Sequence, residues 1–190
     1  MTKSATILDE TLLAAGRFRL ERLGVEIVEN NGTVRRIDYE IYRHGPAAAV
    51  LLYDPERRVA LLARQFRLAS YLATGALDSL EVAAGMLDHE APDVCVRREA
   101  MEEVGIRIRD LRFAFHLTTN PSCLTETLAC YVAAYAPEDI VASGGGVDAD
   151  EYIERVEMGF DEAIAALERG DIRDAKTVAL LWFARAKGLI

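Results

Sequence analysis

The chain has 190 residues, of which 51% are hydrophobic, and its formal net charge is -9. A chain of this length and apolar content can bury the core of one domain of ordinary size, with a small additional unit. The acidic balance argues against a protein that binds the nucleic-acid backbone, because such a protein needs a basic surface. No apolar run reaches the length that crosses a bilayer, and the polar residues 1–10 predict no signal peptide.

Three cysteines lie without the spacing of a metal site: Cys95, Cys123 and Cys130. Reduced thiols in a cytoplasmic protein are the simplest interpretation of this odd number. We therefore expect a cytoplasmic protein with no membrane or nucleic-acid partner.

Residues 1–44 are predicted to form a small N-terminal antiparallel β-unit. Apolar and polar residues alternate over Arg17–Glu29, and Thr33–Arg43 is predicted to return as a second strand. Residues 30–32, Asn-Asn-Gly, predict a hairpin turn because these residues tolerate positive φ. A hairpin is marginally stable alone. We therefore expect the unit to pack on the main domain or on a partner chain.

Residues 45–190 are predicted to be a second domain in which strands and helices alternate. Strands are expected at 47–53, 58–66, 80–84, 109–117, 125–135 and 152–158. Helices are expected at 92–104, 161–169 and 175–187, and Asp174 can cap the last of them. The segments 68–79 and 137–151 are expected to be connections, and the second is acidic with three successive glycines. This order predicts an α/β fold with a mixed sheet between helices.

The segment Gly85–Ile106 has the pattern of a glycine turn, a short loop and a helix. Pro92 suits the first helical position, and Gly105 suits the left-handed position after the last turn. Four apolar residues are predicted on one side of this helix: Val94, Ala100, Met101 and Val104. Three carboxylates share the opposite arc: Glu99, Glu102 and Glu103. Because like charges at this spacing repel, we expect a cation there, and oxygen ligands suit Mg²⁺ or Mn²⁺.

This segment resembles the Nudix box, whose second half is Arg-Glu-apolar-any-Glu-Glu-any-Gly-apolar. The residues 98–106 match that half, and seven residues separate Glu90 from Arg98, as in the family. The loop departs from the pattern, because four residues instead of five separate Gly85 from Glu90. A solvated acidic helix is the alternative, but it would not require the turn, the arginine and the capping glycine. The resemblance covers about residues 47–189 and implies a Nudix α/β/α sandwich.

The resemblance also implies a metal site. Its ligands would be Glu99, Glu103 and the backbone carbonyl of Ala84, and Glu102 would complete the catalytic set. Arg98 is either a surface charge or, as in the family, an ion-pair partner that orients these glutamates.

The acidic loop carries a further expected site residue. In the ADP-ribose and GDP-mannose pyrophosphatases of the family, a glutamate in this loop completes the metal site or acts as the base. Glu151 is the matching position here, with Asp150 as its substitute, although a solvated loop is the alternative. Such a loop could close over the substrate and exclude water.

Several residues outside the helix are expected to contact the substrate. Arginine suits bidentate phosphate contacts, and in the run 64–67 we favour Arg67 over Arg64 for the diphosphate, although both could be edge charges. Lys176 lies in a run similar to one in the GDP-mannose branch, where the lysine contacts substrate; a surface lysine is the alternative. Glu81 is either an exposed strand residue or an outer member of the metal and water network, and Gly85 completes this set.

The N-terminal β-unit is expected to add contacts across a homodimer. Arg17, Tyr39 and Glu40 occupy positions where this branch gathers nucleotide and sugar contacts. Pro121 follows Ile106 by fifteen residues, an offset typical of members that act on ADP-ribose, although a loop proline is the alternative. The choice of base and sugar stays open on these residues.

Taken together, the residues and the resemblance predict a Mg²⁺-dependent pyrophosphatase, with Mn²⁺ as the other metal. Its substrate would be a nucleoside-diphosphate sugar such as GDP-mannose or ADP-ribose, cleaved to a nucleoside monophosphate and a sugar phosphate. A Nudix-fold binding or regulatory module without turnover is the alternative. The complete set of helical glutamates favours the enzyme.

Overall fold

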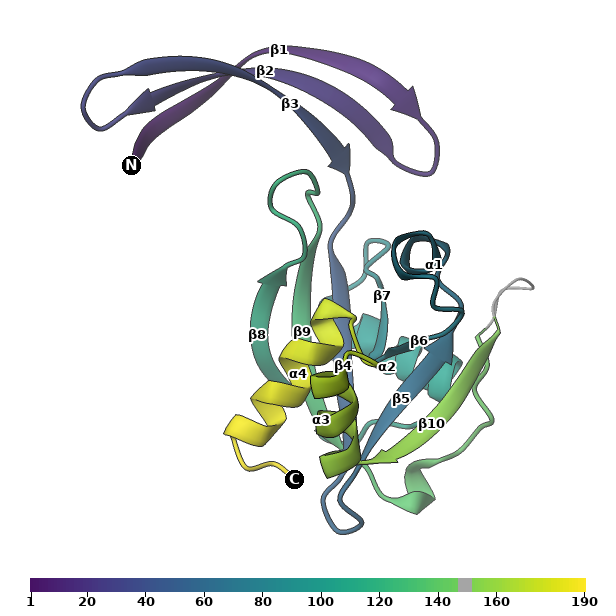
Figure 1. Ribbon diagram of the computed structural model, residues 1–190. Helices are drawn as coiled ribbons and strands as arrows, with labels where there is room; N and C mark the ends of the chain where they lie inside the picture. Colours follow the sequence, from purple (N-terminus) through teal and green to yellow (C-terminus); the bar gives the residue numbers. More distant parts are fainter. Residues whose placement is uncertain (147–151) are drawn as a thin grey trace. The chain divides into compact units, whose positions relative to one another are not determined.

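The computed structural model describes residues 1–146 and 152–190 (Figure 1). The chain divides into two compact units. The first unit contains Met1–Pro46 and Thr118–Thr127, and the second contains Ala47–Leu117 and Leu128–Ile190. No helix in the described ranges is long and apolar enough to cross a membrane.

The first unit is built on a three-stranded antiparallel sheet in the order β1-β2-β3. Its strands are β1 (Thr2–Ala15), β2 (Arg19–Glu29) and β3 (Val34–Arg43). The two strands and the turn predicted from the sequence are confirmed, but β1 was not predicted. All residues of β1 are exposed, so neither face of this strand is buried. A strand without a buried face shows no alternation of apolar and polar residues from which it could be predicted.

The segment 118–127 joins this sheet at the end of β3. The Tyr42 N–H donates to the Cys123 carbonyl at 2.8 Å, and the Thr125 N–H donates to the Tyr42 carbonyl. His44 Nδ1 lies 3.2 Å from a carboxylate oxygen of Glu126. The segment therefore belongs to the first unit by hydrogen bonding as well as by packing.

The second unit contains a seven-stranded mixed sheet. Five strands lie in the order β10-β5-β4-β9-β8, while β6 pairs with β5 and β7 pairs with β4. The strands are β4 (Ala47–Asp54), β5 (Val59–Gln65), β6 (Ser79–Glu81), β7 (Ala83–Met86), β8 (Arg112–Thr118), β9 (Thr127–Ala134) and β10 (Ile153–Gly159). Strands β4 and β9 are parallel, and β4 is buried along its whole length. Such continuous burial is expected of a strand covered on both faces.

Helices cover both faces of this sheet (Figure 1). They are α2 (Pro92–Val104) on one face, and α3 (Phe160–Arg169) and α4 (Ala175–Ala186) on the other. Alternate residues of β4 divide accordingly: Ala48, Val50 and Leu52 pack with α2, whereas Ala49 and Leu51 pack with α3 and α4. The predicted α/β/α sandwich is confirmed.

The structure corrects four local predictions. The short helix α1 (Leu68–Thr74) occupies part of a segment predicted to be a connection, and it buries no residue, so its sequence lacks an apolar stripe. The single strand predicted at 80–84 is two strands separated at Val82. On α2, Val94 is exposed, whereas Cys95 and Val96 are buried instead. In the segment 137–151, a 3₁₀ helix (Pro137–Asp139) forms.

Candidate active site

Helix α2 begins and ends as its sequence predicts. Pro92 is the first helical residue, and Gly105 has a left-handed φ of 70° while its N–H bonds to the carbonyl of Met101. Ile106 follows and is fully buried, as expected of the residue that closes a helix of this kind. These ends fix the rotation and length of the helix that carries the glutamates.

The three successive glycines also close this helix. The Gly145 N–H donates to the Glu103 carbonyl, and the Gly146 N–H donates to the Glu102 carbonyl, each at 3.0 Å. A Cβ at Gly144 would overlap the backbone of Glu103. The glycine run thus satisfies carbonyls that a helix end leaves unpaired, a role that the sequence analysis did not assign.

Glu103 projects from α2 toward β7 and is 7% exposed. One of its carboxylate oxygens accepts a hydrogen bond from the Ala84 N–H at 3.2 Å. Burial and the nearby charge of Glu99 raise the pKa of Glu103 to about 8, although the charges of Arg67 and Lys176 act in the opposite direction. Burial and the neighbouring carboxylate therefore disfavour the charged form of Glu103.

Glu99 lies against Gly85 at the middle of β7. A Cβ added at Gly85 would overlap the Glu99 carboxylate, so this position requires a residue without a side chain. The Arg98 guanidinium is 2.9 Å from the Glu99 carboxylate. Two predicted metal ligands, Glu99 and Glu103, thus face the same short strand that carries Ala84.

Arg98 brings three glutamates together. Its guanidinium nitrogens lie 2.6 Å from Glu90, 2.9 Å from Glu99 and 2.8 Å from Glu102. The shortened loop therefore still delivers Glu90 to the arginine, through a turn in which His89 adopts a φ of 75°. The hydrogen bond from Arg98 lowers the pKa of Glu90. Of the two interpretations of Arg98, the ion pair is confirmed.

A second charged network lies between β6, the start of α1 and the start of α4. Glu81 is 4% exposed and accepts two hydrogen bonds from Arg67, at 3.0 and 3.2 Å, and one from Lys176 at 2.8 Å. Lys176 also bonds to Asp174 at 2.9 Å. Burial alone would raise the pKa of Glu81, but the charges and hydrogen bonds of Lys176 and Arg67 lower it to about 2. The interpretation of Glu81 as an exposed strand residue is wrong.

The other predicted site residues belong to neither of these two clusters. Arg64 forms an exposed ion pair with Glu154 at 2.8 Å. Three belong to the first unit: Arg17, whose guanidinium lies over the Phe18 ring, and the β3 residues Tyr39 and Glu40. Glu151 and its substitute Asp150 lie outside the described residues.

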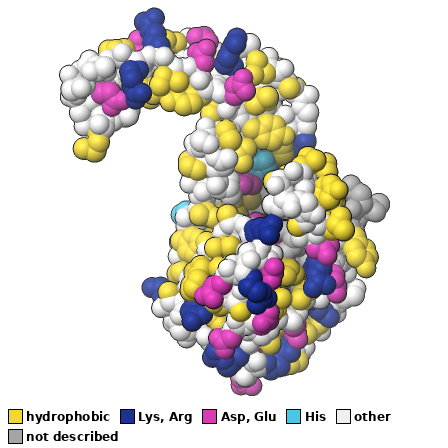
Figure 2. Space-filling model, viewed as in Figure 1, with side chains coloured by type: hydrophobic (Ala, Val, Ile, Leu, Met, Phe, Trp, Pro, Cys, Tyr) yellow, Lys and Arg dark blue, Asp and Glu magenta, His cyan; other side chains and the backbone are white. Residues whose placement is uncertain are grey.

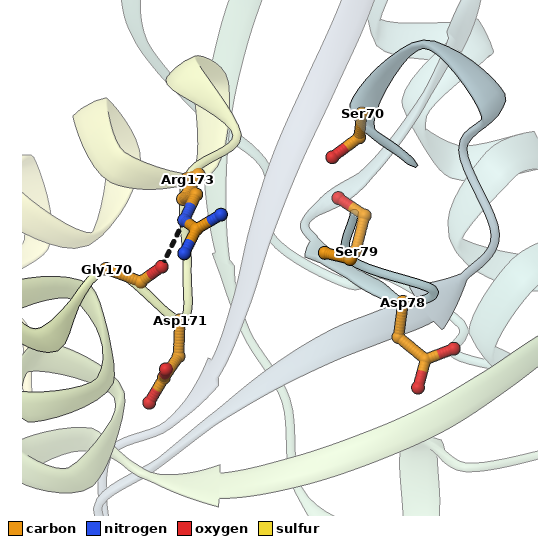
Figure 3. A pocket seen from close by; sticks show the side chains of 7 residues that line it. Ser70, Asp78, Ser79, Gly170, Asp171 and Arg173 are labelled. Atoms are coloured by element: carbon orange, nitrogen blue, oxygen red, sulfur yellow. Dashed lines mark hydrogen bonds between the residues drawn. The ribbon is translucent and has the colours of Figure 1, made fainter. Parts of the chain in front are cut away.

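A small pocket of about 180 Å³ opens beside Ser79, the first residue of β6 (Figure 3). Its lining comes from α1, the segment before β6, the first residue of β6 and the connection between α3 and α4: Ser70, Ala76, Asp78, Ser79, Gly170, Asp171 and Arg173. Arg173 donates to the Gly170 carbonyl. None of these lining residues was singled out from the sequence, because their neighbourhood depends on how distant segments pack.

The donor set of the first cluster suits a hard divalent cation. Its ligands would all be oxygens, from Glu99, Glu103 and the carbonyl of Ala84, and the proximity of the two carboxylates favours a cation. Among residues 1–146 and 152–190, no three or more His, Cys, Asp or Glu side chains group so that they could hold a metal. Few protein ligands are typical for Mg²⁺, which keeps several waters and binds substrate phosphates.

Two kinds of known protein are similar to this chain. The model of the NUDIX domain matches residues 43–181. A GDP-mannose pyrophosphatase of Cronobacter sakazakii is 38% identical, and one of Escherichia coli O157:H7 is 35% identical; each match covers all of both chains. A crystal structure of an ADP compounds hydrolase superimposes with a TM-score of 0.75 at 25% identity, covering 100% of this chain and 97% of that one.

Proposed function

This chain belongs to the Nudix hydrolase family, and we propose that it hydrolyses the diphosphate of a nucleoside-diphosphate sugar, with GDP-mannose as the first candidate. The observation that carries the proposal is the placement of Glu99 and Glu103 against β7, at Gly85 and Ala84. The products would be a nucleoside monophosphate and a sugar phosphate. The relatives named GDP-mannose pyrophosphatase match over their full length and support this substrate, with ADP-ribose as the second candidate.

Glu99, Glu103 and the carbonyl of Ala84 would hold Mg²⁺, or Mn²⁺ in its place. Such a cation, when bound, neutralises phosphate charge and lowers the pKa of a coordinated water. Arg98 holds Glu99 and Glu102 by ion pairs and so restricts their rotamers. We assign the proton-accepting role to Glu151, with Glu102 and Glu103 completing the catalytic set.

Arg67 and Lys176 are the proposed diphosphate contacts. The Arg67 side chain is 47% exposed although it bonds to Glu81, so part of its guanidinium can meet a phosphate. Lys176 has three N–H donors, and within the described structure two of them bond to Glu81 and Asp174. Both side chains are therefore held in place before the substrate arrives. Gly85 remains a proposed part of the substrate site because its missing side chain lets the Glu99 carboxylate lie against the backbone. Arg64 is the weaker candidate because it pairs with Glu154.

The activity test is a panel of nucleotide sugars, with and without Mg²⁺, whose products are separated by anion-exchange chromatography. We expect GDP-mannose to yield GMP and mannose 1-phosphate only when Mg²⁺ is present, and Glu103→Gln to abolish this reaction. Tight binding of GDP-mannose without hydrolysis would contradict the proposal and favour the binding or regulatory module. Hydrolysis that does not depend on Glu103 would contradict the assigned site.

We further propose that two copies of the chain associate through the N-terminal β-unit, residues 1–44. Strand β1 is an edge strand that exposes four large apolar side chains: Ile7, Leu8, Leu12 and Leu13. Figure 2 shows hydrophobic side chains among the charged ones on this sheet. An edge strand with exposed apolar residues is a template for pairing with another chain. The dimer would bring Arg17, Tyr39 and Glu40 to a shared substrate site.

Light scattering during size-exclusion chromatography tests the dimer. We expect a dimer for the natural chain and a monomer for Leu12→Lys, because a charge cannot be buried in an apolar interface without a large free-energy penalty. Ser4→Lys adds the same charge to β1 outside the apolar set and should leave the dimer intact. A natural chain that is monomeric at micromolar concentration would contradict the proposal.

We place the enzyme in the cytoplasm. The free thiols Cys95, Cys123 and Cys130 support this, because a reducing compartment keeps thiols free. Fractionation of the source cells tests this location, and recovery outside the cytoplasm would contradict it.

A further inference from the structure

The first turn of α4 holds the junction between β6 and β7 at two successive residues. The Thr177 hydroxyl accepts a hydrogen bond from the Val82 N–H at 2.8 Å, and Lys176 Nζ donates to Glu81 at 2.8 Å. Asp174 joins these two contacts, because it accepts from the Thr177 hydroxyl at 2.6 Å and from Lys176 at 2.9 Å. The contacts form a closed ring, since Glu81 and Val82 are adjacent in the chain.

The junction requires such an anchor because the chain changes its strand partner there. Glu81 pairs with Ala63 of β5, whereas Ala83 pairs with Val50 of β4. Val82 lies between the two strands and is 1% exposed. A buried N–H without an acceptor is unfavourable by the desolvation free energy of that group, so this site needs an acceptor. Thr177, which is completely buried, supplies it.

The anchored junction leads directly into the metal-binding strand. Ala84 follows Val82 by two residues, and its N–H donates to Glu103 at 3.2 Å. Gly85 comes next and lies against Glu99. A shift of the chain at Val82 would therefore displace the backbone that both glutamates face.

We propose that Thr177 is a positioning residue that acts through Val82 and Ala84 on Glu103. Its hydroxyl fixes the path of β7 and thereby the distance between the Ala84 backbone and the Glu103 carboxylate. The expected effect on the affinity for a divalent cation rests on the proposed function, whereas the expected effect on the path of β7 does not. Outer partners that orient metal ligands typically change metal affinity 10–100-fold when they are removed.

The first measurement is hydrogen exchange of the Ala84 amide in the full chain. Thr177→Val removes the hydroxyl at nearly constant volume, and we expect the Ala84 amide to exchange about tenfold faster relative to the amides of β9. Thr177→Ser retains the hydroxyl and should restore the natural rate. Val178→Ala removes packing from the neighbouring position on α4 and should leave the relative rate of Ala84 unchanged.

The second measurement is Mn²⁺ affinity without substrate, followed by electron paramagnetic resonance. We expect Thr177→Val to weaken Mn²⁺ binding about tenfold and Thr177→Ser to restore it. If the natural chain binds no Mn²⁺ while the exchange of Ala84 still responds to Thr177→Val, then the substrate-free protein lacks the proposed metal site and the positioning role stands. The panel of nucleotide sugars then decides the proposed function separately.

The inference is overturned if folded Thr177→Val keeps the natural exchange rate of Ala84, or if Val178→Ala accelerates that exchange equally. Thr177→Cys provides a second test if Thr177→Val does not fold. A thiol has nearly the same volume but is a weak acceptor for the Val82 N–H, so we expect an intermediate acceleration of Ala84 exchange. No acceleration in Thr177→Cys would likewise overturn the inference.

Discussion

The two buried glutamates of the site, Glu81 and Glu103, have opposite electrostatic surroundings. Glu81 accepts hydrogen bonds from Arg67 and Lys176, and its pKa is lowered to about 2. Glu103 accepts a backbone N–H, and its pKa is raised to about 8 by burial and by Glu99. Within the described residues, no Lys, Arg or His nitrogen lies within ion-pair distance of Glu103.

We infer from this difference that Glu81 is a structural carboxylate, whereas Glu103 is available to bind a ligand. The charge of Glu81 is balanced inside the protein, so its free energy is already favourable without any ligand. The charged form of Glu103 is disfavoured by burial and by Glu99, so a divalent cation beside these two carboxylates would favour that charged form. The same residue type thus forms internal ion pairs in one cluster and is a proposed cation ligand in the other.

The largest expected effect is on catalysis. Glu103→Gln should lower kcat by about three orders of magnitude, because it removes a charged ligand of the proposed cation. The free energy of unfolding of the metal-free protein should not fall, since the raised pKa leaves Glu103 largely protonated near neutral pH and the Gln amide oxygen can still accept the Ala84 N–H. Steady-state kinetics and urea unfolding measure the two quantities. A loss of stability large enough to explain the loss of activity would show that Glu103, like Glu81, has a structural role.

Glu81→Gln should instead act on stability. It leaves Arg67 and Lys176 partly buried without a full counter-charge, and we expect a loss of about 3–5 kcal/mol in the free energy of unfolding. Glu154→Gln removes the exposed partner of Arg64 and should lose less than about 1 kcal/mol, which makes it the control. Equal losses in urea unfolding would show that burial does not distinguish these two pairs.

Gly85→Ala tests the close approach of β7 to the glutamates. The added methyl must displace the Glu99 carboxylate, so we expect kcat/KM to fall about tenfold and the Mn²⁺ affinity to weaken. Gly159→Ala is the matched control, because a Cβ there meets no atom within 4 Å. If Gly85→Ala retains natural kinetics, then the position of Glu99 against β7 is not required for activity.

The smallest expected effect is a pH dependence that Glu81 contributes. Its pKa is about 2 when folded and 4.5 in the reference state, so its stabilisation is present above about pH 4.5 and is lost as the pH falls toward 2. The stability difference between the natural chain and Glu81→Gln should therefore shrink between pH 5 and pH 3. Urea unfolding at several pH values measures this difference. A constant difference would show that the carboxylate of Glu81 is not held in its charged form.

Local patterns predicted the elements that depend on neighbouring residues. The ends of α2 follow from Pro92 and Gly105, and the cap of α4 follows from Asp174, whose side chain accepts the Thr177 N–H. The buried strand β4 follows from a continuous apolar run. In each case the determining residues lie within one or two turns of the element, where periodicity and capping rules apply.

Contacts between distant segments were not predictable in the same way. Thr177 bonds to a residue 95 positions away, and the break at Val82 exists only because β4 and β5 diverge there. Strand β1 carries no buried face, so alternation gave no signal for it. The ion pair of Glu81 with Lys176 likewise depends on the packing of α4 against β6, which joins residues 95 positions apart. Tertiary packing, not local propensity, decides these features.

We propose above that a divalent cation binds between α2 and β7. The most direct measurement is anomalous scattering from a crystal of the natural chain soaked in Mn²⁺ together with GDP-mannose. We expect an anomalous peak within coordination distance of carboxylate oxygens of Glu99 and Glu103. A crystal in which the nucleotide sugar is bound but these two carboxylates have no anomalous peak beside them would contradict the account.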